Sequence, residues 1–308
     1  MTRAELEEDI SIGDTVKITT KSGEFTGRVE EFGESAVKLT NLENGKPKRI
    51  AYDFIMEYDT DIAPGSDVIS IRVDSESKLV AIPGTKYRMG QTPVTQRLYK
   101  KVMGENPSYF QHSNDDLDEE QRDALEGNTA NNPVETVTWF DAVYFCNKLS
   151  MMEGLTPAYS VDGETDPEYW GYTPHLGVSI DSYVDCDFSA NGYRLPTNYE
   201  WENAANGGES YTYSGSDDLD DVGWYEDNSN KVTHPVAQNM ANGYGLYDMS
   251  GNVCEWVWET YPGFPDRRFY RGGSYCDSAD ICEVSDLNGN GAVIRSDDLG
   301  FRLLRPID

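Results

Sequence analysis

The residues of this chain best suited to chemistry are two cysteines near its C-terminal end, Cys276 and Cys282. They follow the turn sequence RGGS at residues 271–274. Two thiolates on one loop are soft ligands that suit Cu(I), and a thiolate can also act as a nucleophile. The alternative is structural, because a single cysteine more often packs as a small hydrophobic residue. The spacing of the two cysteines therefore helps to decide between a thiolate site and structural packing.

The composition excludes several classes of partner. Among 308 residues, 55 are acidic and 25 are basic, which gives a formal net charge of -30. Such a surface repels phosphate backbones and anionic lipid head groups, so we expect neither nucleic acid nor membrane insertion. The simplest use of the charge is solubility, and the alternatives are divalent cation sites or a basic partner.

Leader, disulfide and zinc signals are also missing from the sequence. No apolar run approaches the about 20 residues of a transmembrane helix, and the first residues, MTRAELEEDISIGD, do not resemble a secretion signal. We therefore expect a cytoplasmic protein, unless the chain is displayed at a surface by another route or has been trimmed at its start. Five scattered cysteines disfavour a disulfide framework, and His112, His175 and His234 lack the spacing of a zinc site.

The N-terminal part alternates apolar and polar residues in short runs. Turn signals at Ser22-Gly23, Gly33 and Asn44-Gly45 separate these runs. The pattern predicts a small all-β module over residues 1–60, similar in rhythm to SH3-like or Sm-like barrels. Residues 61–67, rich in Asp with a Pro-Gly pair, are the expected linker, and a larger domain is expected over residues 68–308.

Two helices and one capping motif are predicted in the larger domain. Thr95 is placed to cap a helix that carries Leu98, Tyr99, Val102 and Met103. A second helix is expected in TVTWFDAVYFCNKLSMMEG, with a glycine stop and with Cys146 as a buried packing residue. In YRLPTNYEWENAA, a threonine followed three residues later by glutamate predicts a capping box.

Five motifs occur in a fixed order over about residues 68–306. They are TPVTQRLYKKVMGENPS, NPVETVTWFDAVYFCNKLS, GYRLPTNYEWENAANGG, THPVAQNMANGYGLYDMSGNVCEWVWE, and RGGSY with DDLGFRLLR. Together they resemble the formylglycine-generating enzyme (sulfatase-modifying factor) family. The resemblance implies an α+β fold of the C-type-lectin-like class, with little regular secondary structure and with loops that form the binding face.

The enzymes of this family imply one possible activity. They oxidise a substrate cysteine to formylglycine with two copper-holding thiols placed three and eight residues after the serine of the GGS turn. Counted from Ser274, the second position is Cys282, but the first is Asp277, and Cys276 stands one residue early. Neighbouring side chains of an extended segment point to opposite faces, so the shift moves the thiol away from the expected place. A copper-dependent oxidase is therefore the alternative function.

A second branch of the family comprises the variable proteins of diversity-generating retroelements, which bind ligands through rewritten C-terminal residues. These proteins share an RGGSW start, a fixed Cys-x-Val-Ser and a GFRL end. This chain has RGGSY at 271–275, CEVS at 282–285 and GFRL at 300–303. The resemblance implies a variable region over about residues 271–302, held by a frame. The frame residues are Trp201, Trp256, Trp258, Arg271, Gly272, Gly273, Gly300, Phe301 and Arg302.

Composition offers a check on this interpretation. Adenine-directed mutagenesis of Asn-type codons that end in a pyrimidine cannot produce Lys, Gln, Glu, Met or Trp. None of these occurs in 276–281 or 286–298, although an ordinary acidic loop could look similar. We predict a non-catalytic variable protein that needs no cofactor and binds an unknown protein ligand. Its predicted ligand-binding residues are Cys276, Asp277, Ser278, Asp280, Ile281, Asp286, Asn288, Gly289, Asn290, Gly291, Val293, Ile294, Ser296, Asp297 and Asp298.

Structural calcium is the remaining expectation. The resemblance implies calcium ligands in the turn GNVCEW, where Asn252 and Glu255 stand at the matching positions and Cys254 replaces a tryptophan. Oxygen atoms of Asn, Glu and the backbone are the hard ligands that calcium prefers.

Overall fold

A computed structural model provides the structure of this chain. It describes residues 78–125 and 129–307 in full, and it describes the backbone of six strands between residues 15 and 73. The chain divides into two compact units, one over residues 1–76 and the other over residues 77–308 apart from Met152–Leu155. Each unit is described by itself below.

The first unit is all β in the residues that the structure describes. Its sheet has the order β4-β3-β2-β1-β6-β5, in which β6 lies parallel to β1 and the other neighbours are antiparallel. The strands are β1 (Thr15–Thr20), β2 (Gly23–Phe32), β3 (Ala36–Asn41), β4 (Pro47–Ala51), β5 (Ile55–Asp59) and β6 (Val68–Val73). We expected residues 68–73 to open the larger domain, whereas they extend this sheet, because β6 pairs with the edge of β1 that β2 leaves open. The closure of the sheet into a barrel stays a prediction, and the linker at 61–67 lies outside the described residues.

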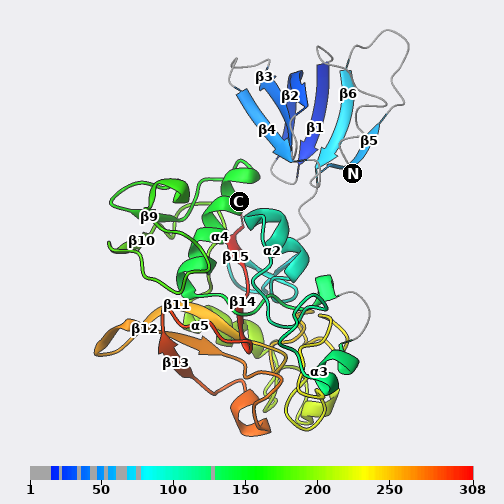
Figure 1. The fold of residues 1–308 in the computed structure, drawn as a ribbon, viewed down its shortest axis with the longest axis vertical. Helices are drawn as coiled ribbons and strands as arrows, with labels where there is room; N and C mark the ends of the chain where they lie inside the picture. Colours follow the sequence, from blue (N-terminus) through cyan, green and yellow to red (C-terminus); the bar gives the residue numbers. More distant parts are fainter. Residues whose placement is uncertain are drawn as a thin grey trace. The chain divides into compact units, whose positions relative to one another are not determined.

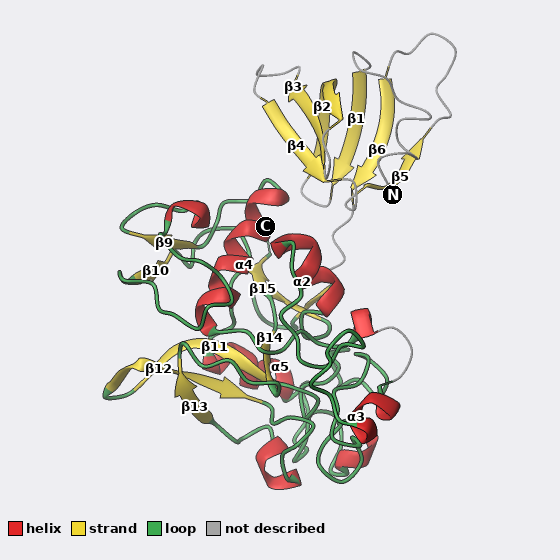
Figure 2. Ribbon diagram, viewed as in Figure 1, coloured by secondary structure: helices red, strands yellow, loops and turns green. Residues whose placement is uncertain are grey.

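The second unit consists largely of loops that connect short elements (Figures 1 and 2). Its helices are α2 (Gln96–Met103), α3 (Glu119–Ala124), α4 (Trp139–Met152) and α5 (Asn198–Ala205). Its 3-10 turns are η2 (Thr129–Asn131), η3 (Pro167–Tyr169), η4 (Leu219–Asp221) and η5 (Ala279–Cys282). Its strands are β7 (Leu79–Ala81), β8 (Tyr87–Gly90), β9 (Tyr159–Val161), β10 (Val184–Cys186), β11 (Cys254–Tyr261), β12 (Phe264–Arg271), β13 (Asn288–Gly291), β14 (Leu299–Phe301) and β15 (Leu304–Pro306).

The predicted helix starts are confirmed by their capping hydrogen bonds. The side chain of Thr95 accepts a hydrogen bond from the backbone N–H of Leu98 at the start of α2. At the start of α5, Thr197 and Glu200 form the predicted capping box. The acidic stretch before residue 125 contains α3, because Asp118 and a glutamine three residues later form a capping box of their own. Within residues 78–125 and 129–307, no helix has both the length and the apolar character that crossing a membrane requires.

The strands bring distant parts of the chain together. The last strand, β15, pairs with β8 and so joins the C-terminal end to the start of this unit. A second sheet has the order β13-β12-β11-β14, in which β14 runs parallel to β11 and β13 lies at one edge (Figure 1). The predicted variable region therefore begins at the end of β12, forms the edge strand β13 and returns through β14.

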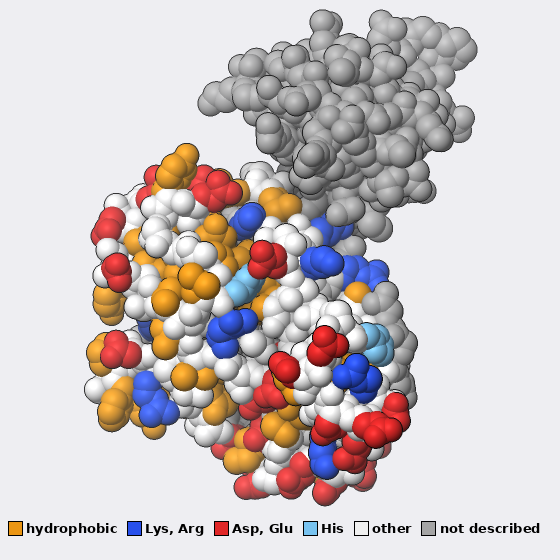
Figure 3. All heavy atoms as spheres, in the orientation of Figure 1, with side chains coloured by type: hydrophobic (Ala, Val, Ile, Leu, Met, Phe, Trp, Pro, Cys, Tyr) orange, Lys and Arg blue, Asp and Glu red, His pale blue; other side chains and the backbone are white. Residues whose placement is uncertain are grey.

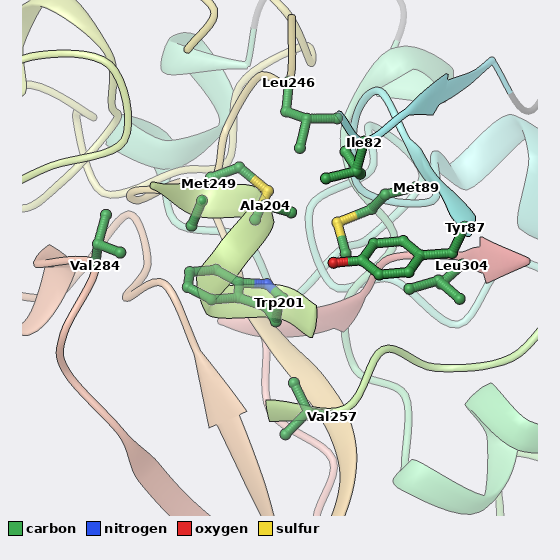
Figure 4. Packing of buried hydrophobic residues seen from close by; sticks show 11 residues of the cluster. Ile82, Tyr87, Met89, Trp201, Ala204, Leu246, Met249, Val257, Val284 and Leu304 are labelled. Atoms are coloured by element: carbon green, nitrogen blue, oxygen red, sulfur yellow. The ribbon is translucent and has the colours of Figure 1, made fainter. Parts of the chain in front are cut away.

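The core lies between these sheets and α5. Trp201 of α5 packs with Met249, Val257 and Leu304 in one buried cluster (Figure 4). Trp256 is also fully buried, as predicted, whereas Trp258 is only half-buried and stacks on Tyr159. The full burial of Cys146 on α4 confirms its predicted packing role.

Candidate functional site

Arg271, at the end of β12, organises the segment that follows it. Its guanidinium donates hydrogen bonds to the backbone carbonyls of Val284 and Asp286, at 3.1 and 2.8 Å, and to the carboxylate of Glu202. The side chain is buried, so its bonds to the two carbonyls form away from bulk water. Because the guanidinium binds backbone carbonyls, it holds residues 284–286 regardless of the side chains there.

Gly273 and Cys282 are packed directly against each other. A Cβ atom on Gly273 would lie 2.6 Å from the sulfur of Cys282, and the φ of Gly273 is +64°. Cys282 is buried with Leu219 and Val222, and burial raises the pKa of its thiol to about 12. The residue thus serves as a packing residue of the frame, as we expected from its fixed position.

Replacing Gly273 by alanine is expected to destabilise the unit. The left-handed backbone alone costs a non-glycine residue about 1–2 kcal/mol, and the clash with Cys282 adds to that cost. Urea unfolding measures the loss. Gly263→Ala is the matched control, because Gly263 also has a positive φ but has no atom within 4 Å of its Cβ position. Equal losses in the two variants would contradict the packing argument.

The two thiols lie in different environments. Cys276 is exposed and its sulfur lies 3.4 Å from the hydroxyl oxygen of Ser274, whereas Cys282 is buried among apolar side chains. Burial raises the pKa of the Cys282 thiol and only Cys276 is exposed, so this arrangement does not favour a pair of accessible thiolates for Cu(I). Asp277, which stands at the family position of the first thiol, supplies a carboxylate there.

An acidic centre lies beside this turn. The ligand-type atoms of Cys254, Asp277 and Asp298 all lie within 4.8 Å of one another. The thiol of Cys254 donates to Asp277 Oδ2 at 3.7 Å, and the hydroxyl of Ser274 donates to the same oxygen at 2.6 Å. Burial, reinforced by the two carboxylates, raises the pKa of Cys254 well above its usual value. The thiol and the hydroxyl thus both donate to one oxygen of the Asp277 carboxylate.

The predicted ligand-binding positions share one property in the structure: none of their side chains or glycines is buried. The buried residues of this stretch are Tyr275, Cys282, Val284, Ala292 and Leu299, and runs of exposed or half-buried residues lie between them. The region therefore consists of surface positions on a buried frame.

The structure brings part of this set together. Asp277 lies next to Asp298, and Asp297 accepts a hydrogen bond from the hydroxyl of Tyr275 at 3.1 Å. Residues 276–281 and 296–298 thus adjoin, while residues 288–291 form the edge strand β13. The pKa of Asp286 is raised by burial and by the charges of Asp280 and Asp277, so these carboxylates also lie near one another.

Asn252 and Glu255, the expected calcium ligands, do not fit calcium. Both oxygens of Glu255 accept hydrogen bonds from Arg302, and one also accepts from the indole N–H of Trp201 at 2.7 Å. The side-chain oxygen of Asn252 accepts from the backbone N–H of His234. A guanidinium and N–H groups occupy the side-chain oxygens that calcium would need, because Arg302 binds Glu255.

Sequence reasoning missed Arg295 and the residues that it reaches. Its guanidinium donates to the backbone carbonyls of Thr136 and His175, at 2.9 and 2.5 Å. These partners lie more than a hundred residues away in the chain, and no local pattern indicates such a contact. Arg295 lies within residues 286–298, a segment that lacks Lys, Gln, Glu, Met and Trp. Its charge alone does not distinguish a structural role from a binding role.

The profile of the sulfatase-modifying factor enzyme 1-like domain matches residues 62–307, which is most of the chain. The chain belongs to this family. Its fold is of the C-type-lectin-like kind, and a solved structure, variable protein 1 of Treponema denticola, superposes with a TM-score of 0.62 at 33% identity. That superposition covers 75% of this chain and 92% of the other.

Relatives in this sulfatase-modifying factor family carry different names. Chaperone protein LppX of Paenibacillus barcinonensis is 38% identical over 250 residues, 71% of this chain and 80% of that protein. Inactive C-alpha-formylglycine-generating enzyme 2 of Mus musculus is 36% identical over 130 residues, 36% of this chain and 42% of that protein. Other matches are named formylglycine-generating enzymes, so names alone do not separate enzymes from non-enzymes in this family.

Proposed function

We propose that this protein is a non-catalytic ligand-binding protein whose binding residues are diversified by a retroelement. The observation that carries the proposal is the burial pattern over residues 275–299, in which runs of exposed or half-buried residues lie between a few buried ones. All of the predicted ligand-binding positions are accessible to solvent, and buried frame residues separate them. Such an arrangement lets surface side chains change without loss of the core.

The way the frame holds this region supports the same proposal. Arg271 binds the carbonyls of Val284 and Asp286 from outside the run of predicted binding positions. Bonds to carbonyl oxygens do not depend on which side chain a residue carries. The path of the backbone can therefore persist while the side chains differ between variants.

The charge of the region indicates the chemistry of the ligand. The predicted binding set includes Asp277, Asp280, Asp286, Asp297 and Asp298 but no lysine or arginine. Carboxylates of one sign steer and favour partners with the opposite charge. We therefore propose a protein ligand with a basic surface, whose affinity falls as salt concentration rises.

Exchange of several exposed binding residues is expected to change partner preference and leave stability nearly unchanged. The variant combines Asp280→Tyr, Ile281→Ser and Ile294→Asn, which alter exposed or half-buried positions. Surface substitutions of this kind change stability by about 0.5 kcal/mol or less each. Thermal unfolding measures stability, and selection of displayed peptides on each protein measures preference. Leu299→Ser is the control that should unfold, because Leu299 is buried.

Two results would contradict the proposal. Collapse of the triple variant would show that these residues support the fold. Copper bound in a fixed ratio through Cys276 and Cys282, with oxygen-dependent conversion of a cysteine peptide that is lost in Cys282→Ser, would identify an oxidase. The coding DNA tests the diversification itself: a nearby reverse transcriptase gene and a near-copy of codons 271–302 that differs only at adenines are expected.

A further inference from the structure

A loop far from the C-terminal region in sequence lies against it in the structure. A Cβ atom on Gly177 would lie 3.7 Å from the carbonyl oxygen of Val293 and 3.9 Å from Cδ of Arg295. Arg295 also donates to the carbonyl of His175 at 2.5 Å. Residues 175–178 are therefore neighbours of the predicted binding positions Val293 and Ile294.

This loop is held rigidly at its base. The backbone N–H of His175 donates to Asp141 Oδ1 at 2.9 Å, and the imidazole Nε2 lies 2.8 Å from the hydroxyl of Tyr99. The other ring nitrogen lies 3.5 Å from a carboxylate oxygen of Glu105. With the bond from Arg295, the backbone and ring of His175 are fixed by four partners from separate parts of the chain.

The same loop exposes apolar side chains. Leu176 is 65% exposed and Val178 is 45% exposed, next to a segment in which Ile294 is 39% exposed. Hydrophobic side chains gather on the side of this unit that carries α4, β9 and β10 (Figure 3). A loop that is fixed at its base and presents apolar groups to water loses little conformational entropy when a partner covers them.

We infer that Leu176 and Val178 form a constant apolar part of the ligand-binding surface, and that its occupant is a protein segment with an apolar side chain beside a basic one. The inference rests on the proposed function. The basic requirement rests on Glu105, which is exposed and contacts His175, and on the carboxylates of the predicted binding set. The guanidinium of Arg295, which is also close, is already bound to the carbonyls of Thr136 and His175. An apolar centre with a charged rim is the usual composition of a protein-binding surface.

The test is a selection of random phage-displayed peptides on the full chain. Enriched peptides are expected to carry Lys or Arg next to Leu, Met or Phe. Their affinity for the double variant Leu176→Ser/Val178→Ser is expected to fall at least about tenfold, as for loss of apolar anchors. Tyr199→Ser, which removes an exposed aromatic residue of α5, is the matched control and should bind unchanged.

The outcomes separate this inference from the proposed function. Peptides that lose affinity for the Asp280/Ile281/Ile294 variant, but not for the loop variant, would overturn the inference and leave the function standing. Failure to enrich basic, apolar peptides would overturn the inference as well. Sedimentation shows whether a second copy is the occupant: self-association that the loop variant abolishes would also overturn it. If the enriched peptides bind both variants as tightly as the wild type, the result would count against both proposals.

Discussion

Glu255→Gln is expected to lower the free energy of unfolding of the larger unit by about 3–5 kcal/mol, the usual cost of leaving one charge of a buried pair uncompensated. The carboxylate of Glu255 is 1% exposed and its partner Arg302 is fully buried, with 2.7 Å between Arg302 Nη2 and Glu255 Oε1. The same guanidinium also donates to the carbonyls of Gly90 and Tyr247. Its position therefore fixes three separate segments, and its charge cannot be solvated when Glu255 is neutral.

Glu202→Gln is the matched control for this prediction. Glu202 also pairs with a buried arginine, Arg271, but its own side chain is 45% exposed. Water can replace the lost charge there, so the expected loss is about 1 kcal/mol or less, as for exposed ion pairs. Urea unfolding at neutral pH measures both variants. Losses of similar size would show that burial of the carboxylate is not what makes the Glu255 pair important.

The stability of the wild-type protein is expected to fall between about pH 4.5 and pH 8 because of Glu135. This side chain is fully buried, and burial raises its pKa from 4.5 to about 8. In that interval the folded chain keeps a proton on Glu135 that the unfolded chain has released, so a rise in pH favours unfolding. This pKa shift corresponds to a loss of at most about 5 kcal/mol in the free energy of unfolding, and the loss is complete above pH 8.

Glu135→Gln tests this pH dependence, because glutamine has nearly the same shape and does not titrate. The difference in unfolding free energy between the wild type and the variant, measured by urea unfolding from pH 4.5 to pH 8.5, should change in favour of the variant as pH rises. The backbone N–H groups of Tyr109 and Phe110 both donate to Glu135, so glutamine leaves one donor poorly paired at every pH, at about 1–3 kcal/mol. A difference that is independent of pH would show that these donors keep the carboxylate ionised.

Glu135 also matters for the binding region. Asp297 lies close enough to raise the pKa of Glu135. The backbone N–H of Phe110 binds Glu135, and its ring packs edge-on against the ring of Tyr275, with 4.9 Å between the ring centroids. Tyr275 in turn donates to Asp297. A buried acid thus supports the acidic surface from beneath, and nothing in the local sequence NPVETVT distinguishes it from an exposed glutamate.

Sequence reasoning was most successful where the interactions are local. The caps at Thr95 and Thr197 depend on neighbours three residues away along the chain. It was least successful at the start of the larger unit, where β6 pairs with strands of the first sheet, and at Asn252 and Glu255. The pairing of β6 depends on the open edge of a distant strand, β1. The partner of Glu255 depends on a distant arginine, Arg302.

The sequence by itself determined the family, through motifs in a fixed order, and it separated the two cysteines of the RGGS turn by counting from Ser274. Only the tertiary structure decided that Cys282 is a buried residue against Gly273, and that Arg295 joins the C-terminal region to the loop of His175. The physical reason is range: capping bonds and turns form between near neighbours, whereas burial and long-range hydrogen bonds exist only after the chain has folded.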